Sequence, residues 1–123
     1  MLPTALPAGF PSPALDFEHE SINLQEHLIH DPPATFIARV SGDSMIGAGI
    51  SDGDRLLIRK GPQPRDGDVV VAVLDGQFTV KRLRLTGAGV LLQADNPEYP
   101  DIPVPELSEL VVWGVAYMCL HSL

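Results

Sequence analysis

The sequence predicts a mainly β fold, in which a compact, mostly antiparallel β domain follows an extended N-terminal arm. Four prolines stand within the first thirteen positions, and such a density prevents a regular helix and favours extended chain. From residue 35 onward, runs rich in Val, Ile, Leu and Thr alternate with turn sequences, the pattern of successive strands. Asp75-Gly76 lies between two of these runs, and Asp-Gly between β-rich runs is a strong hairpin signal.

The chain has 123 residues, a length that fits one domain. We expect an arm over residues 1–31 and the β domain over residues 32–123. Within the arm, Asn23 and Glu26 have the spacing of a capping box, so a short helix carrying Leu24 and Leu28 is expected. Pro32 should end that helix, because the residue before a proline avoids helical geometry.

Six strands are expected, each bounded by turn signals such as Asp-Gly, Gly-Pro or Asn-Pro. Their ranges are Thr35–Val40, Asp54–Arg59, Asp68–Leu74, Gln77–Leu85, Gly89–Ala94 and Leu110–Leu120.

The charge balance argues against nucleic-acid binding. Eight Lys and Arg against sixteen Asp and Glu give a net charge of −8, which repels a phosphate backbone. We therefore expect protein partners and no direct DNA binding. One cysteine, Cys119, allows no internal disulfide, which fits a reducing compartment. No apolar stretch approaches the roughly 20 residues of a membrane helix. A cytoplasmic protein without a membrane anchor is expected.

The segment Ser41-Gly42-Asp43-Ser44-Met45 is the first candidate for chemistry. A turn with a flexible glycine after an apolar strand can lift a serine hydroxyl out of the sheet and leave backbone N–H groups free for an oxyanion. Taken alone this signal is weak, because a serine in a glycine-containing turn is usually structural.

Lys81 is the second candidate. Strand alternation over Gln77–Leu85 puts it on the face of Thr79, Leu83 and Leu85, where desolvation would lower its pKa. To act as a neutral base near pH 7, a lysine must lose about 3.4 pKa units from 10.4, which costs about 4.6 kcal/mol. The ordinary alternative is a solvated strand lysine.

The remaining candidates are weaker. The four histidines are scattered, and their spacing neither requires nor forbids a Ser/His/Asp triad. The Asp-Gly turns lack the spacing of a calcium loop. The sequence contains no glycine-rich phosphate loop and no Cys/His metal cluster. No cofactor or metal is expected.

Several motifs resemble the UmuD and LexA self-cleaving proteins, a serine–lysine peptidase family. They are Ser41-Gly42-Asp43-Ser44-Met45, Gly49-Ile50-Ser51-Asp52-Gly53-Asp54, Phe78-Thr79-Val80-Lys81, Asn96-Pro97-Glu98-Tyr99 and Val112-Trp113-Gly114-Val115. Upstream, residues 8–14, Ala-Gly-Phe-Pro-Ser-Pro-Ala, are similar to the cleavage segment of UmuD proteins in particular. The resemblance extends over nearly the whole chain from Pro7.

The resemblance implies a β domain of the LexA/UmuD C-terminal type that cuts its own arm between Ala8 and Gly9. Ser44 would be the nucleophile and Lys81 its base, with Thr79 orienting the lysine. The N–H groups of Asp43 and Ser44 would form the oxyanion hole. A small Ala8 suits a crowded nucleophile, and Gly9 gives the backbone freedom to kink.

The resemblance also implies a role and partners. Cleavage would be promoted by a RecA filament in the SOS response to DNA damage. The trimmed homodimer would then join a UmuC-type Y-family polymerase in error-prone translesion synthesis. Only eight residues precede the expected scissile bond, fewer than in the best-known UmuD protein. The resemblance therefore does not extend to RecA or dimer contacts that a longer arm would make.

Three other interpretations compete. A LexA-type or phage repressor would need a DNA-binding domain before the cleavage site, and eight residues are too few to form one. A Ser–Lys signal peptidase shares the chemistry but normally needs a membrane anchor. A non-cleaving adaptor for a polymerase is a different class, and the presence of both Ser44 and Lys81 argues against it.

Overall fold

The computed structural model describes residues 8–10, 23–29, 32–61, 63–105 and 109–123. The chain divides into two compact units, Met1–His30 and Asp31–Leu123. The prolines of the expected extended arm, Pro3, Pro7, Pro11 and Pro13, lie outside the described residues. In the parts of the chain that are described, no helix has the length and apolar character needed to cross a membrane.

The first unit contains one short helix, α1 (Leu24–Leu28). Asn23 caps it as the sequence predicts: its side-chain Oδ1 accepts a hydrogen bond from the Glu26 backbone N–H at 3.3 Å. That bond satisfies one of the N–H groups that a helix start leaves unpaired. No residue of α1 is buried.

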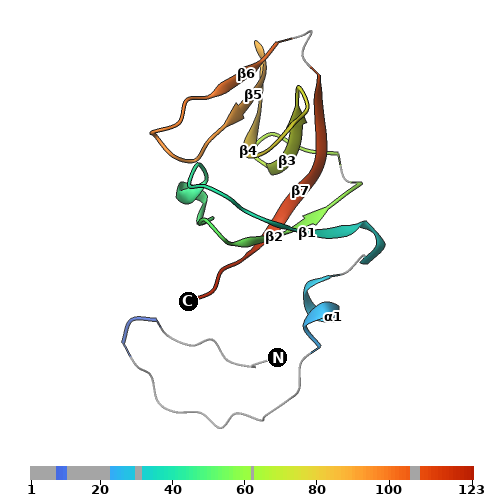
Figure 1. Cartoon of the computed structure of the whole chain (residues 1–123), viewed down its shortest axis with the longest axis vertical. Helices are drawn as coiled ribbons and strands as arrows, with labels where there is room; N and C mark the ends of the chain where they lie inside the picture. Colours follow the sequence, from blue (N-terminus) through green and yellow to red (C-terminus); the bar gives the residue numbers. More distant parts are fainter. Residues whose placement is uncertain (1–7, 11–22, 30–31, 62, 106–108) are drawn as a thin grey trace. The chain divides into compact units, whose positions relative to one another are not determined.

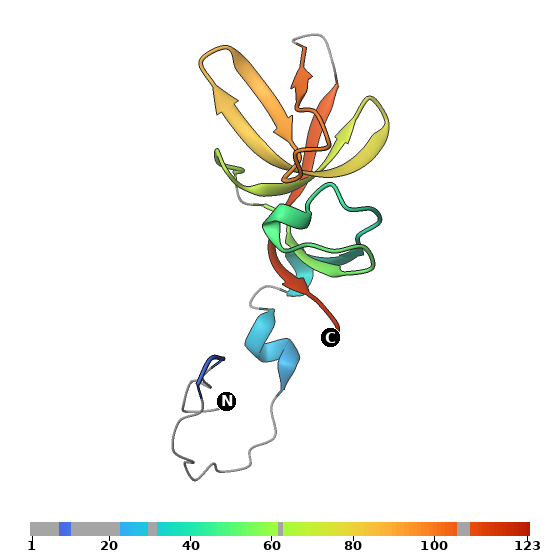
Figure 2. The same cartoon turned by 90° about the vertical axis from the view of Figure 1, so that its left-hand side faces the viewer.

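The second unit is a mainly β domain in which all neighbouring strands are antiparallel (Figures 1 and 2). A 3₁₀ turn, η1 (Pro32–Ala34), leads into the sheet, and a second, η2 (Ile46–Ala48), follows β1. The strands run in the order β1-β2-β7-β3-β4-β5-β6 across the sheet. Their bounds are β1 Thr35–Arg39, β2 Arg55–Arg59, β3 Val69–Leu74, β4 Gln77–Thr86, β5 Gly89–Gln93, β6 Ile102–Val104 and β7 Leu110–Leu120. The predicted fold class is confirmed.

The six expected strands are found with bounds that differ by at most one residue. The sequence interpretation missed β6, a three-residue strand that contains Pro103. β6 pairs with β5 alone and forms one edge of the sheet. An edge strand tolerates proline, because the missing N–H can be the one that faces away from the sheet.

β7 is the long strand that both halves of the sheet share. Its C-terminal half pairs with β2 and its N-terminal half pairs with β3. The register skips Tyr117 in the first pairing and Trp113 in the second, so each is the extra residue of a β-bulge. A bulge re-aims the side chain at its site, and these two aromatic side chains line two different hollows of the domain.

The apolar core consists of two clusters. The first lies under the loop after β1 and contains Met45, Leu56 and Ile58. The second contains Val70, Leu83 and Leu92 from β3, β4 and β5. The first cluster is the one that matters for the candidate site, because Met45 is buried directly after Ser44 in the chain.

Candidate active site

Ser44 and Lys81 meet at the first core cluster. Lys81 Nζ lies 3.1 Å from Ser44 Oγ, although 37 positions separate the two residues in the chain. The same Nζ also lies 3.1 Å from Thr79 Oγ1 and 3.2 Å from the Val80 carbonyl oxygen. The ammonium therefore has three acceptors, one for each of its three N–H donors.

Burial lowers the pKa of Lys81 below its ordinary value of 10.5. Lys81 is half-buried and forms no ion pair with a carboxylate among the described residues. A neighbouring carboxylate would favour the charged form, and its absence leaves desolvation unopposed. The neutral form of the Lys81 amine is therefore more favoured in this site than it would be in water.

The loop that carries Ser44 is held at its start by Asp52. The Gly42 N–H donates a 2.7 Å hydrogen bond to Asp52 Oδ1. Gly42 has a φ of +94°, a conformation that residues with a Cβ rarely adopt. The glycine and the aspartate together set the chain direction immediately before the serine.

Asp43 is held from the far side by the Asn96-Pro97-Glu98-Tyr99 segment. Asn96 Nδ2 donates to the Asp43 backbone carbonyl at 3.0 Å, and the Tyr99 hydroxyl donates to Asp43 Oδ1 at 2.5 Å. The Asp43 side chain and carbonyl are thus fixed by two residues more than fifty positions away. The sequence interpretation recognised this segment as a turn signal and a family motif and assigned it no role in the site. Asn96 is one of the buried polar residues.

Asp95 connects the same segment to β4. Arg82, the neighbour of Lys81, donates to Asp95 Oδ2 from NH2 at 2.6 Å and from Nε at 2.9 Å. The Gly47 N–H donates to the Asp95 carbonyl at 2.7 Å, and a Cβ on Gly47 would stand 2.5 Å from that oxygen. Only glycine lets η2 approach this backbone so closely.

The hydrogen bond from Asn96 also determines the direction of the Ser44 N–H. In a trans peptide the N–H of one residue points opposite to the carbonyl of the residue before it. Because the Asp43 carbonyl points at Asn96, the Ser44 N–H points away from Asn96. Within the described part of the chain, neither this N–H nor that of Asp43 donates a hydrogen bond.

A groove of about 420 Å³ lies beside the Ser–Lys pair. Two strand edges border it. β1 is at the edge of the sheet. The backbone N–H and carbonyl of Val40 form hydrogen bonds on the β2 side, so by alternation the N–H and carbonyl of Arg39 point away from the sheet. On β4, the backbone N–H and carbonyl of Leu83 bond toward the β3 side, so alternation turns those of Phe78 toward the β5 side. Pairing with β5 begins only at Arg82, so the backbone groups of Phe78 lie on an open edge.

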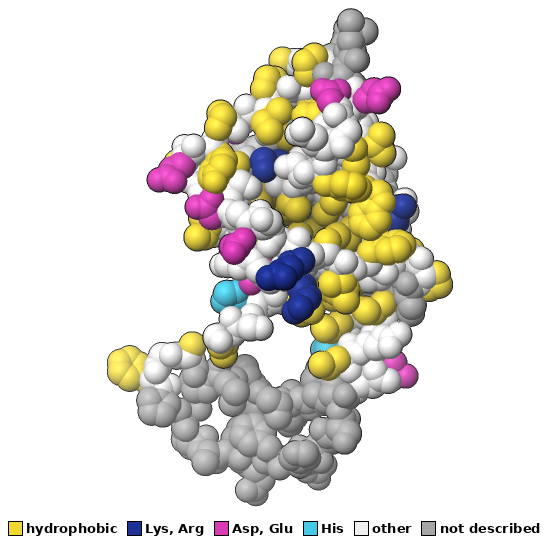
Figure 3. Space-filling view, viewed as in Figure 1, with side chains coloured by type: hydrophobic (Ala, Val, Ile, Leu, Met, Phe, Trp, Pro, Cys, Tyr) yellow, Lys and Arg dark blue, Asp and Glu magenta, His cyan; other side chains and the backbone are white. Residues whose placement is uncertain are grey.

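The walls of the groove are largely apolar. Trp113, at one bulge of β7, lines the groove together with Phe78 and Val71. Phe36 packs against Trp113 with ring centroids 5.1 Å apart. Figure 3 shows hydrophobic side chains gathered over the middle of the domain on the face drawn there. Ala8 and Gly9, the expected scissile pair, belong to the first unit.

Comparison with known proteins shows the family of this chain. The model of the peptidase S24-like family matches residues 1–117. The chain belongs to this family. It is 45% identical over 116 residues to Protein SamA of Salmonella typhimurium, a match that covers 94% of this chain and 80% of that protein. It is 41% identical over 115 residues to Protein ImpA of Escherichia coli, with 93% and 77% covered.

The match to a LexA repressor is shorter. The chain is 46% identical over 86 residues to the LexA repressor of Dechloromonas aromatica, covering 69% of this chain and 43% of that protein. The predicted membership of the LexA/UmuD family, of the UmuD type, is confirmed by these matches.

Proposed function

We propose that this S24-like protein is a Ser–Lys peptidase that cuts its own Ala8–Gly9 bond. The single observation that carries the proposal is the 3.1 Å distance between Lys81 Nζ and Ser44 Oγ in a site where burial lowers the lysine pKa. A nucleophile within hydrogen-bond reach of its base is the arrangement that nucleophilic catalysis requires.

Neutral Lys81 removes the proton from the Ser44 hydroxyl, and Oγ attacks the carbonyl carbon of Ala8. The Lys81 ammonium that results returns a proton to the Gly9 nitrogen as the peptide bond breaks. Water then releases the acyl group from Ser44. While Lys81 is neutral, its two N–H groups can donate to Thr79 and the Val80 carbonyl, so its lone pair is left for Ser44. Thr79 is thus the residue that orients the base.

The N–H groups of Asp43 and Ser44 stabilise the oxyanion in this proposal. They have no acceptor within the described chain, and the Asn96 bond to the Asp43 carbonyl fixes the peptide to which the Ser44 N–H belongs. Donors that are fixed before the reaction cost no reorganisation when the negative charge develops. Removal of one such donor typically lowers kcat about 10²- to 10³-fold.

The two open strand edges favour an extended substrate. A peptide in strand conformation can pair with the free groups of β1 or β4, and alternate side chains then enter the apolar groove. The segment Ala8-Gly9-Phe10-Pro11 has this character, with a small residue at the bond and a proline that prevents helix. A substrate on the same molecule also gains effective concentration.

The wider role that we propose follows the family. Cleavage is promoted by a RecA filament in the SOS response, and the trimmed form acts as a homodimeric accessory subunit of a UmuC-type Y-family polymerase in the cytoplasm. The net charge of −8 favours these protein contacts over direct DNA contact. Sedimentation equilibrium at micromolar concentration tests the homodimer, and a species that is only monomeric would contradict it.

The test of cleavage is mass spectrometry of the purified chain held between pH 7 and pH 10. We expect a product that begins Gly9-Phe10-Pro11 and a rate that rises with pH, because Lys81 must lose its proton first. Ser44→Ala should abolish the product. Lys81→Arg should abolish it too, because a guanidinium stays protonated.

Each result bears on a different part of the proposal. A product with another N-terminus would refute the Ala8–Gly9 assignment. Cleavage by Lys81→Arg at the unsubstituted rate would refute the lysine base. A chain that stays intact at pH 10 with and without RecA filaments would favour the non-cleaving adaptor.

A further inference from the structure

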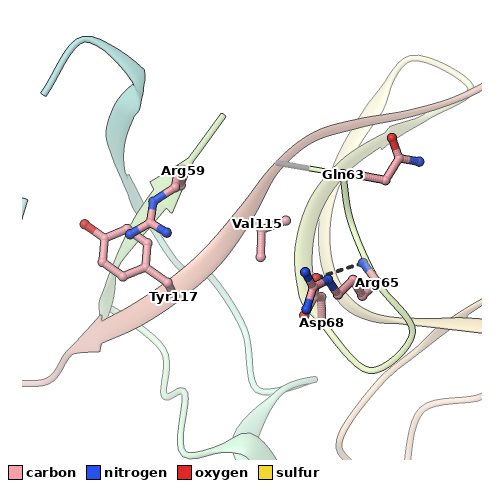
Figure 4. A pocket seen from close by; sticks show the side chains of 6 residues that line it. All are labelled: Arg59, Gln63, Arg65, Asp68, Val115 and Tyr117. Atoms are coloured by element: carbon pink, nitrogen blue, oxygen red, sulfur yellow. Dashed lines mark hydrogen bonds between the residues drawn. The ribbon is translucent and has the colours of Figure 1, made fainter. Parts of the chain in front are cut away.

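A second hollow, of about 470 Å³, lies on the β domain and shares no residue with the Ser44 groove. Figure 4 shows Arg59 and Tyr117 on one side of Val115, and Arg65 and Asp68 on the other. Guanidinium groups therefore stand on two opposite walls, with an apolar side chain between them.

The position of Arg59 is fixed by its neighbour on β7. Tyr117 is the extra residue of one β7 bulge, and the Arg59 guanidinium lies 4.6 Å from the centroid of its ring. Stacking on an aromatic face holds a guanidinium while leaving its N–H donors available. Arg59 therefore loses less side-chain freedom on binding an anion than an unsupported arginine would.

The charges in this hollow are unbalanced. Neither Arg59 nor Arg65 forms an ion pair with a carboxylate among the described residues. Among the residues that the structure describes, Asp68 is the one acidic residue that lines the hollow, and its Oδ2 accepts a 2.9 Å hydrogen bond from the Arg65 backbone N–H. In a chain with twice as many acidic as basic residues, two arginines left facing one hollow indicate an anionic ligand.

We propose that this hollow binds an acidic peptide segment, with Arg59 and Arg65 each holding a carboxylate and Val115 contacting an apolar side chain between them. Arginine is suited to this because its planar fork matches a carboxylate. A nucleic acid is a poorer fit, since the net charge of −8 opposes a polyanion that extends beyond the hollow. A single small anion would use one wall and leave the apolar floor uncovered.

The probe is a synthetic peptide with the sequence of residues 14–22, Ala-Leu-Asp-Phe-Glu-His-Glu-Ser-Ile, which has three carboxylates and no Lys or Arg. A fluorescent form is titrated with the full-length Ser44→Ala chain, which is used so that the protein stays intact. We expect saturable binding that weakens as salt is raised from 50 to 500 mM, because charged contacts are screened.

Arg59→Gln and Arg65→Gln should each weaken binding about tenfold, the typical worth of a charge-assisted hydrogen bond. Arg65 is exposed, so its replacement leaves core packing untouched. Arg65→Gln therefore still tests the proposal if Arg59→Gln lowers the stability of the fold. Lys60→Gln is the matched control. Its Nζ lies over the Phe36 and Trp113 rings, outside this hollow, so the affinity should stay unchanged.

Three results would overturn the proposal. The first is equal binding of a peptide whose three carboxylates are replaced by Asn and Gln. The second is displacement by inorganic phosphate at the same concentration as the acidic peptide, which would indicate a site for small anions. The third is binding by the doubly substituted Arg59→Gln, Arg65→Gln chain with unchanged affinity.

Discussion

Asn96 donates a 3.0 Å hydrogen bond from its side-chain amide to the backbone carbonyl of Asp43, 53 positions earlier in the chain. This bond fixes the peptide group that joins Asp43 to Ser44. A buried residue outside the Ser–Lys pair therefore controls where the Ser44 N–H points, since the two groups of one trans peptide are opposed.

Asn96→Ala should lower the rate of self-cleavage by at least tenfold, because the Ser44 N–H, the oxyanion donor that we propose, would no longer be held and would contribute less to the transition state. The pH at which the rate rises should not move, because Lys81 keeps its surroundings. The measurement is the cleavage rate across pH 7 to 10, with circular dichroism to verify the fold. Gln93→Ala is the control, since Gln93 accepts from Arg84 and not from the serine loop. A shifted pH profile would mean that Asn96 acts through the lysine.

Lys81 should make stability depend on pH. Burial lowers its pKa below 10.5, so between the folded and unfolded pKa values the unfolded state binds more protons, and stability rises with pH. In the Ser44→Ala background, Lys81→Met should raise the free energy of unfolding near pH 8, and the gain should shrink toward pH 11. Urea denaturation at a series of pH values measures it. An equal trend for Lys60→Met, at an exposed lysine, would show that burial of Lys81 is not the cause.

Cys119 should react slowly in the folded protein. Burial, and after it the nearby Asp54 carboxylate, raise the pKa of the Cys119 thiol from 9.0 to about 11. The Cys119 Sγ lies 3.2 Å from Asp54 Oδ2. Because the thiolate is the reactive form, alkylation by iodoacetamide at pH 8 should be about a hundredfold slower than for an ordinary thiol. The same protein in urea is the control and should react at the ordinary rate. Equal rates in both states would contradict the raised pKa.

Gly114 should not tolerate a side chain. A Cβ there would lie 2.5 Å from Ile58 Cγ2 and 3.2 Å from the Arg59 carbonyl oxygen. Gly114→Ala should lower the free energy of unfolding by about 1–3 kcal/mol, the usual cost of overpacking. Gly87→Ala is the matched control, because nothing lies within 4 Å of a Cβ at that position. Thermal melting compares the two, and equal losses would mean that the close approach of β2 to Gly114 is not the cause.

The sequence by itself determined the local elements of this protein. The strands were predictable because alternation of apolar residues and Asp-Gly turns act over a few neighbouring residues. The cap at Asn23 was predictable for the same reason. The Ser44 and Lys81 motifs were recognisable, and alternation put Lys81 on the face of Thr79, whose hydroxyl its amine contacts.

The tertiary structure decided how those pieces meet. The 3.1 Å contact of Lys81 with Ser44 and the bond from Asn96 to Asp43 join residues 37 and 53 positions apart, and no local pattern encodes such distances. The same holds for β6, which has three residues, one of them a proline, and is defined as a strand only by its pairing with β5. The bulges at Trp113 and Tyr117 arise only when β7 pairs with β3 and β2. These features depend on long-range pairing, because each forms only where separate segments are packed together.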